Sequence, residues 1–201
     1  MKDTYKNFQQ LCEHHVEGRD FEIETTERRS PVLVIAPHGG SIEPCTTELA
    51  RLIAGDDFSF YSFKGIRKSG NWEFLHITSH CFDEPRAIQM ARLADIVLAI
   101  HGKKNNQKEF IIVGGRHASL CGQIKASLRR EGFELKLPDK RVAAEHHLNI
   151  CNCGRAEKGV QLELSSRLRQ SFQSHPPHEH PLIDEYRIDH SPFEHVIFVP
   201  V

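Results

Sequence analysis

Two uninterrupted apolar runs constrain the fold of this chain more than any other feature: PVLVIA at residues 31–36 and DIVLAIH at residues 95–101. Both are rich in β-branched residues, and apart from the ends of the second neither alternates with polar ones. This pattern is typical of strands that are buried on both faces. Such strands belong to parallel sheets whose two faces are covered by helices. The two runs therefore predict an α/β fold with these segments at the centre of the sheet.

The remaining segments alternate between strand and helix patterns. Further strands are expected at residues 21–25, 58–63, 74–78, 110–113, 133–137, 159–164 and 195–201, and helices at 5–12, 48–53, 85–93, 118–130 and 165–172. This order predicts a three-layer α/β sandwich with a mostly parallel, mixed sheet of about seven or eight strands. We interpret residues 1–201 as one domain, in which the proline- and histidine-rich segment 173–193 forms a surface excursion before the last strand.

Charge and cysteine content narrow the classes of function. The chain carries 26 basic and 27 acidic side chains, and the resulting net charge of −1 provides no overall field for nucleic acid or an anionic membrane. The polar start MKDTYKNFQQ lacks the apolar core of a signal peptide. We therefore expect a cytoplasmic protein without a signal peptide, which host-cell lysis could release, with no nucleic-acid or membrane partner. A monomer is favoured, and six scattered cysteines predict reduced thiols.

An unusual number of histidines, 14 of 201 residues, directs attention to the strand ends. In open α/β sheets, binding sites form beyond the carboxyl ends of the strands. His38 and Glu43 follow the first apolar run in the glycine-bearing segment PHGGSIE, and His101 ends the second run. Two histidines and a carboxylate, with a fourth position left for water, are the ligand set of a catalytic zinc site.

Glu163 interrupts the otherwise apolar strand GVQLELS, in which Leu162 and Leu164 face the other side. Its carboxylate must therefore point to a partner or into a cavity. A water activated at the strand ends would be such a partner. Glu163 would act as the general base that takes the proton of this water and returns it to the leaving amine.

Each of these residues also has a structural interpretation. A histidine after a strand is commonly a hydrogen-bonded loop residue, Glu43 could be a helix N-terminal charge, and Glu163 could pair with an arginine. One strand end carries His38 and Glu43, a second carries His101, and a third carries Glu163. This combination favours one shared site over three separate structural roles.

Other histidines and cysteines are not assigned to the predicted zinc site, and whether Cys151, Cys153 and the C-terminal histidines bind a second metal stays open. His76 is predicted to pack or hydrogen-bond within strand 74–78, and His80 to act as an outer partner or helix cap, because a site with three protein ligands is already complete. Cys151 and Cys153 lack the second cysteine pair of a zinc ribbon and are interpreted as buried or loop thiols.

Six segments in a fixed order carry a family resemblance. They are APHGGSIEPCTTELARLIAG, LHITSHCFDEP, DIVLAIHG, the glycine pair at 114–115, NICN at 149–152 and GVQLELS. Over about residues 5–169 the chain resembles the phage-type poly-γ-glutamate hydrolases, small zinc peptidases of phages and bacteria with a zinc-carboxypeptidase-like core. Six ordered motifs are far more specific than any one of them.

The resemblance implies one bound zinc ion, with His38, Glu43 and His101 as its ligands and Glu163 as the catalytic residue. The sequence departs from the family pattern at three other positions. Cys45 stands where glycine is usual, Lys64 where an acid is common, and Cys153 where arginine is common.

The implied substrate is poly-γ-glutamate or a related γ-glutamyl amide, a polyanion whose carboxylates need basic side chains near the metal. Arg116, which follows the double glycine, and Lys64 and Arg67, which follow the run FSFYSF, are the expected substrate-binding residues.

Two other functions remain open on the sequence. One is a zinc amidase or deacylase for a small N-acyl amino acid, which would have a closed pocket in place of an open basic groove. The other is a non-catalytic zinc-binding module of a phage or bacterium. The open ligand set and Glu163 argue against the latter, because structural zinc sites are usually closed by four protein ligands.

Overall fold

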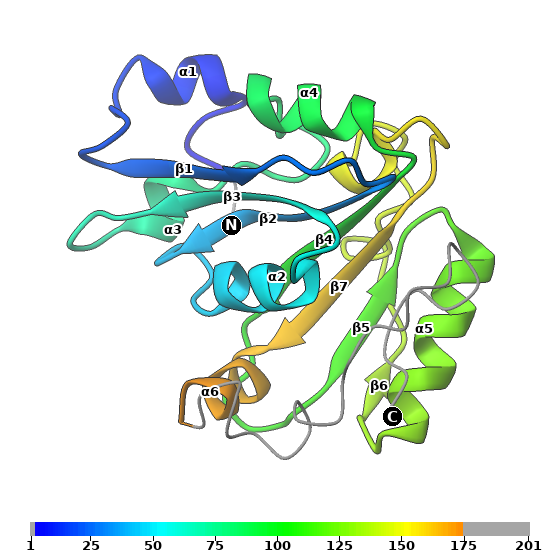
Figure 1. The fold of residues 1–201 in the computed structure, drawn as a ribbon. Helices are drawn as coiled ribbons and strands as arrows, with labels where there is room; N and C mark the ends of the chain where they lie inside the picture. Colours follow the sequence, from blue (N-terminus) through cyan, green and yellow to red (C-terminus); the bar gives the residue numbers. More distant parts are fainter. Residues whose placement is uncertain (1–2, 175–201) are drawn as a thin grey trace.

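The computed structural model describes residues 3–174, and within them seven strands form one sheet (Figure 1). Its strand order is β1-β3-β2-β4-β7-β5-β6. Neighbouring strands are parallel except β1 with β3 and β5 with β7, so the predicted mixed, mostly parallel sheet is confirmed. The strands are β1 Phe21–Thr26, β2 Val32–Gly40, β3 Ser59–Gly65, β4 Ile96–Lys103, β5 Ile111–Gly114, β6 Leu135–Lys136 and β7 Val160–Ser165.

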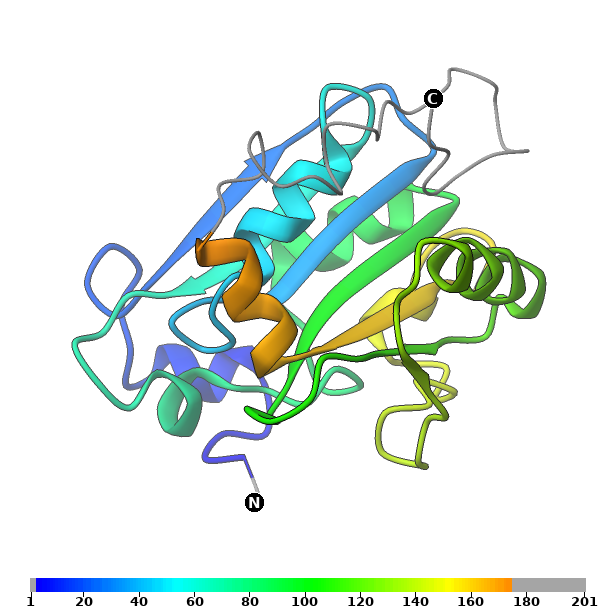
Figure 2. The ribbon, with the colours of Figure 1, turned by 90° about the horizontal axis from the view of Figure 1, so that it is seen from below.

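Helices cover both faces of the sheet, as Figures 1 and 2 show from two directions. One face, called the α4 face below, packs against α1 (Phe8–Cys12), α3 (Asn71–Leu75), α4 (Pro85–Leu93) and the 3₁₀ turn η1 (Ile150–Asn152). The opposite face, called the α2 face, packs against α2 (Thr46–Ala54), α5 (Ala118–Arg130) and α6 (Ser166–Ser174). Each face has its own hydrophobic core, so the predicted three-layer sandwich is confirmed.

Alternation along the two central strands assigns each side chain to one face. In β4, Val97 and Ala99 belong to the core of the α4 face, whereas Leu98 and Ile100 belong to the core of the α2 face. His101 continues the series of Val97 and Ala99 and therefore faces α4. Both faces of these strands are buried, as their unbroken apolar sequence predicts.

The strand predicted at residues 74–78 is wrong. This segment instead contains the end of α3, followed by extended chain that joins no strand. β3 is already flanked by β1 and β2, so the sheet offers no edge there for another strand. The backbone N–H of Thr78 donates to Oδ2 of Asp3 instead (2.7 Å).

β2 continues three residues past the predicted loop start at Pro37 and contains a β-bulge. Ala36 pairs with Ser62 and Gly39 pairs with Lys64, so β2 has one residue more than β3 between these pairs. The extra residue reverses the alternation. As a result His38, which would otherwise share the α2 face with Ala36, lies on the α4 face. Gly39 has no side chain to collide with the hydroxyls of Ser62 and Thr47.

Some predictions fall on residues that the structure does not describe. The final strand at 195–201 and nearly all of the excursion at 173–193 lie outside the described residues, and residues 173–174 belong to α6. Among the helices of residues 3–174, none combines the length and apolarity needed to cross a bilayer. All six cysteines are described and are free thiols, as predicted.

Candidate metal centre

Three side chains meet at the carboxyl ends of β2 and β4. His38 lies near the end of β2, His101 near the end of β4, and Glu43 in the loop between β2 and α2. Nδ1 of His38 lies 3.1 Å from Nδ1 of His101 and 3.4 Å from Oε2 of Glu43. His101 Nδ1 lies 3.7 Å from the same oxygen. All three residues are buried, and we call them the ligand cluster.

Outer hydrogen bonds orient each member of the ligand cluster. Nε2 of His38 lies 2.8 Å from the backbone oxygen of Ile77. Because a carbonyl only accepts, His38 must carry a proton on Nε2, so its Nδ1 can offer a lone pair to a metal. The backbone N–H of Gly102 donates to Oε2 of Glu43 (2.7 Å), and Nε2 of His101 lies 3.3 Å from the hydroxyl of Ser79.

Burial and the neighbouring imidazoles act in opposite directions on the carboxyl of Glu43. Burial alone would raise the pKa of Glu43, but His38 and His101 beside it hold the pKa of this carboxyl well below its usual range. Glu43 is therefore an anion held between two imidazoles. This is the charge state that a metal-ligating carboxylate requires.

The donor set fits a zinc ion. Tetrahedral ligands at about 2.0–2.2 Å from zinc lie about 3.3–3.6 Å from one another. The three separations in the ligand cluster, 3.1, 3.4 and 3.7 Å, bracket this range. Nitrogen and carboxylate donors without thiolate are typical of hydrolytic zinc sites.

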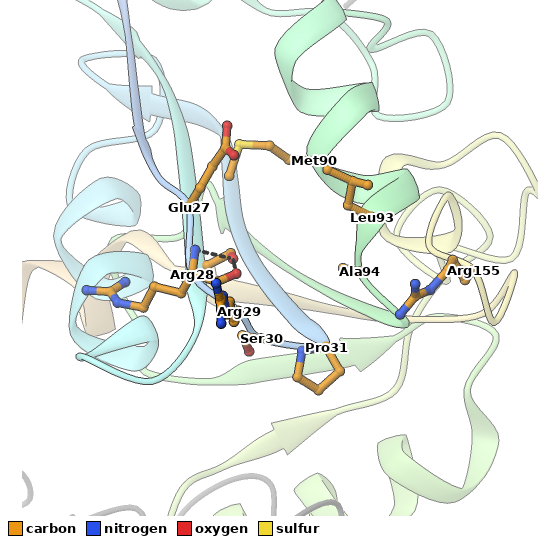
Figure 3. Close-up of a pocket in the computed structure, with 10 residues that line it drawn as sticks. Glu27, Arg28, Arg29, Ser30, Pro31, Met90, Leu93, Ala94 and Arg155 are labelled. Carbon is orange, nitrogen blue, oxygen red and sulfur yellow. Dashed lines mark hydrogen bonds between the residues drawn. The ribbon is translucent and has the colours of Figure 1, made fainter.

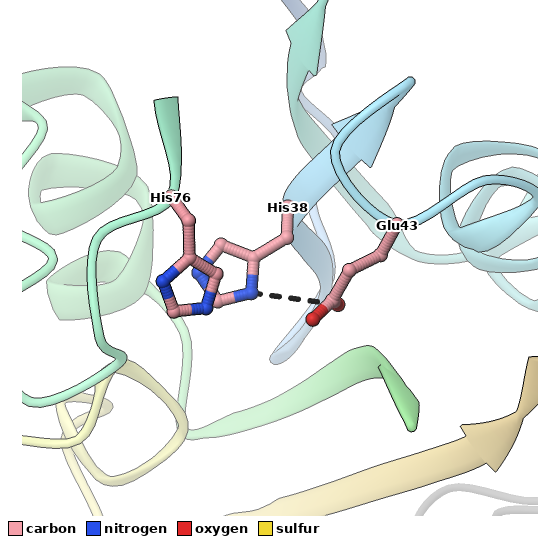
Figure 4. A group of neighbouring side chains, drawn as sticks. All are labelled: His38, Glu43 and His76. Atoms are coloured by element: carbon pink, nitrogen blue, oxygen red, sulfur yellow. Dashed lines mark ion pairs between the residues drawn. The ribbon is translucent and has the colours of Figure 1, made fainter. Parts of the chain in front are cut away.

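His76 lies beside the ligand cluster and not in a strand, so its predicted placement is wrong (Figure 4). Its ring centroid is 4.1 Å from that of His38, and its Nδ1 lies 2.8 Å from Oδ1 of Asp3. Ligand atoms of His38, Glu43 and His76 lie within 4.8 Å of one another, which makes His76 a second candidate for the third ligand. Separations of 3.1 and 3.7 Å to the other two members of the ligand cluster and a place directly across from Glu163 favour His101 as the third ligand.

Glu163 stands directly across from His101 in the pairing of β4 with β7. Leu162 and Leu164 belong to the core of the α2 face, so Glu163 lies on the same face as the ligand cluster. Burial raises the pKa of its carboxyl above the ordinary value, although the neighbouring His101 acts in the opposite direction. A carboxyl with a raised pKa next to a metal site suits proton transfer near neutral pH.

The structure does not bring Arg116 to the carboxyl ends of β4 and β7. It follows β5, which runs antiparallel to β7 with Gly114 opposite Gln161. Arg116 therefore lies beyond the amino end of β7, whereas Glu163 lies towards its carboxyl end. The prediction of a substrate role rested on the double glycine before Arg116 and took no account of the direction of β5.

Lys64 and Arg67 are also engaged elsewhere. Lys64 shares the α2 face with Phe60 and forms ion pairs with Glu22 and Glu24 of β1, at 3.2 and 3.5 Å. Arg67 donates to Oδ1 of Asp20 (2.8 Å) and stacks on the ring of Phe74. These contacts argue against the predicted role of either residue in substrate binding.

Arg169 is a buried cation next to the cluster that the sequence analysis missed. It lies on α6, donates to the backbone oxygens of Leu164 and Pro44, and leaves no room for a side chain at Gly102. Burial lowers the pKa of its guanidinium, and the nearby Glu43 opposes this effect. Arg169 thus fixes the loop of Glu43 from the α2 face. Arginines on helices are mostly exposed, so the sequence carries no signal for it.

Cys45, two residues after Glu43, has an unusual backbone conformation. Cys45, where the resembled family usually has glycine, has a φ of 74°, in the left-handed region that favours glycine. A basic pocket lined by Arg28, Arg29 and Arg155 lies at the amino ends of β2 and β4, opposite the end that carries the ligand cluster (Figure 3).

Comparison with known proteins identifies similar chains. Residues 5–181 match the family model of poly-gamma-glutamate hydrolase. The SPbeta prophage-derived protein YoqZ of Bacillus subtilis strain 168 is 38% identical over 172 residues, which cover 85% of this chain and 61% of YoqZ. This chain therefore spans about three fifths of that relative.

Two solved structures have the same fold. A bacteriophage poly-gamma-glutamate hydrolase is 34% identical with a TM-score of 0.81, and the match covers 85% of this chain and 83% of that one. The zinc-free apo form of YndL is 36% identical with a TM-score of 0.80, and the match covers 85% and 84% of the two chains.

Proposed function

This chain belongs to the poly-γ-glutamate hydrolase family, and on that premise we propose that it is a zinc-dependent hydrolase that cleaves the γ-glutamyl amide bonds of poly-γ-glutamate. The observation that carries the proposal is the ligand cluster with Glu163 across from His101 on the next strand. The solved structure of the relative YndL, a zinc-free apo form, adds support for zinc as the metal.

His38 Nδ1, Glu43 Oε2 and His101 Nδ1 would hold the metal. When bound, zinc would supply a Lewis acid that polarises the amide carbonyl and makes water more acidic. The family's reaction needs this chemistry because an amide is a poor electrophile and neutral water is a poor nucleophile.

Glu163 would move the protons of the reaction. Its carboxylate takes a proton from the attacking water as the water oxygen bonds to the amide carbon. It then gives the proton to the amide nitrogen as the carbon–nitrogen bond breaks, which releases an amine and a carboxylate. The raised pKa of this buried carboxyl suits both steps, because the group must gain and lose a proton in each cycle.

Lys103 is a basic side chain suited to a carboxylate of the substrate. It lies at the end of β4, two residues after His101, and its charge acts on Glu163. We place it ahead of Arg116, Lys64 and Arg67, whose role in substrate binding stays a prediction.

Incubation of zinc-loaded protein with poly-γ-glutamate tests the proposal, with chain length followed by gel filtration. The polymer should shorten, a chelator should stop the reaction, and added zinc should restore it. A neutral amide of an N-acyl amino acid serves as the competing substrate. Efficient cleavage of that amide with intact polymer at every ionic strength would instead support the small-substrate amidase.

Removal of the Arg67 side chain should affect stability and leave turnover intact. We expect Arg67→Ala to lower the free energy of unfolding by about 1–3 kcal/mol, because it takes a charged hydrogen-bond partner from the buried Asp20. The KM for poly-γ-glutamate should stay at its wild-type value. Denaturant unfolding and steady-state kinetics measure both quantities. The exposed neighbour Lys68, changed to alanine, is the matched control and should alter neither. A large rise in KM for Arg67→Ala alone would reinstate it as a substrate-binding residue.

A further inference from the structure

Three buried polar side chains form a chain of hydrogen bonds that ends at Glu163. Asn149 Nδ2 donates to Oε1 of Gln161 (3.1 Å), and Gln161 Nε2 donates to Oε1 of Glu163 (2.8 Å). Their exposed fractions are 6%, 3% and 7%, so these contacts are shielded from water. Asn149 belongs to the segment NICN, for which the proposed reaction has so far given no role.

The backbone fixes the direction of this chain. The N–H of Cys151 donates to Oδ1 of Asn149 (3.1 Å), and an amide N–H can only donate. Asn149 must therefore turn its NH₂ group towards Gln161, which then presents its own NH₂ group to Glu163. The arrangement matches a carboxylate that accepts at Oε1, and it leaves Oε2 for the reacting water.

The turn that carries Asn149 is held firmly against the sheet. Asn152 accepts from the N–H of Gly159 (3.1 Å) and donates to the backbone oxygens of Ala144 and His146 (2.8 and 3.0 Å). Gly159 has no side chain, and a Cβ there would overlap the carbonyl of Cys151. This close approach brings η1 within reach of β7.

We propose that Asn149 and Gln161 are positioning residues that hold Glu163 in the orientation and hydrogen-bonding state of a general base. This inference rests on the proposed function of Glu163. It assigns a catalytic purpose to the NICN segment, which does not itself contact Glu163 and acts through Gln161. The positioning residues should influence the proton-transfer step and neither metal binding nor substrate affinity.

Two substitutions test the proposal on zinc-loaded, folded protein with poly-γ-glutamate as substrate. Gln161→Met keeps the length of the side chain but removes the donor to Glu163. Asn149→Leu keeps the shape of asparagine but leaves the Gln161 amide without a partner that fixes its direction. Each should lower kcat about 10- to 100-fold, the usual cost of losing an outer partner, with KM and zinc content unchanged.

Asn152→Leu is the matched control. It removes an amide of the same turn that makes more hydrogen bonds than Asn149 but none to Gln161. We expect it to lower stability and leave kcat per folded molecule within about threefold of wild type. Equal losses of kcat in the two leucine variants would overturn the proposal, because they would show a structural role for the whole turn.

Glu163→Gln separates this inference from the proposed function. If Gln161 and Asn149 act through Glu163, neither substitution should lower kcat further in the Glu163→Gln background. Normal activity of Glu163→Gln would refute the role of Glu163 itself. A large effect of Glu163→Gln with wild-type kcat for Gln161→Met would refute only the positioning role.

The side-chain amide signals of Gln161 provide a readout that does not depend on activity or metal. They can be assigned in a ¹H–¹⁵N spectrum by their loss in Gln161→Met. They should shift in Glu163→Gln and Asn149→Leu and stay in place in Asn152→Leu. If a leucine variant does not fold, Gln161→Met and its double variant with Glu163→Gln decide the question. Unshifted signals in Glu163→Gln would contradict the hydrogen bond on which the proposal depends.

Discussion

Glu163→Gln should lower kcat for poly-γ-glutamate about 10²- to 10⁴-fold, the usual worth of general acid–base catalysis. Glutamine keeps the size of the side chain and can still accept a hydrogen bond, but it cannot take a proton from water. Zinc content should stay at the wild-type level because Glu163 lies on β7, apart from the ligand cluster on β2, its loop and β4. Steady-state kinetics and metal analysis of the same preparation measure both effects.

Glu43→Gln is the matched control for this experiment. It makes the same chemical change in a carboxylate that contacts both imidazoles, and it should therefore weaken zinc binding. If Glu163→Gln lost zinc and Glu43→Gln kept it, the two glutamates would have exchanged roles and the assignment of base and ligand would be wrong.

His101→Ala should reduce zinc affinity more than any outer substitution. Removing one of three protein ligands leaves the ion with two, whereas loss of an outer partner costs about 10- to 100-fold. Activity at limiting zinc should fall with the affinity. Titration against a chelator of known affinity gives the zinc dissociation constant directly.

His76→Ala distinguishes the two candidates for the third ligand. The His76 ring contacts the His38 ring, and its Nδ1 hydrogen-bonds to Asp3. Removal of the side chain should therefore lower zinc affinity no more than the loss of an outer hydrogen-bond partner does. If instead His76→Ala released the zinc and His101→Ala retained it, the metal would lie among His38, Glu43 and His76.

The sequence predicted the elements that the strongest patterns define. The two apolar runs became the central strands β2 and β4, and the predicted bounds of α4 and α5 match the structure at both ends. Pro85 at the start of α4 and Gly132 just after α5 are the sequence signals that made these two helices predictable. The convergence of His38, Glu43 and His101 followed from their place after parallel strands, although their metal role stays a prediction.

Features that depend on tertiary pairing could not be predicted. The direction of β5 decides where Arg116 lies, and nothing in the residues of β5 encodes it. The segment 74–78 has the composition of a strand, but β3, the strand before it in the chain, is already paired on both sides. His76 reaches the ligand cluster partly through Asp3, a residue more than 70 positions earlier in the chain.

The bulge in β2 makes regular pairing with β3 incompatible with the position of His38 in the ligand cluster. A chain with one extra residue in β3 between Ser62 and Lys64 could pair β2 with β3 without interruption, and its ladder would be more regular. The same insertion would restore the alternation along β2, turn the imidazole of His38 towards α2 and take one member from the ligand cluster. A variant designed for greater stability through regular pairing of β2 with β3 would therefore lose His38 from the proposed metal site. Under the proposed function, the bulge is part of the metal site and should be kept in any stabilised variant.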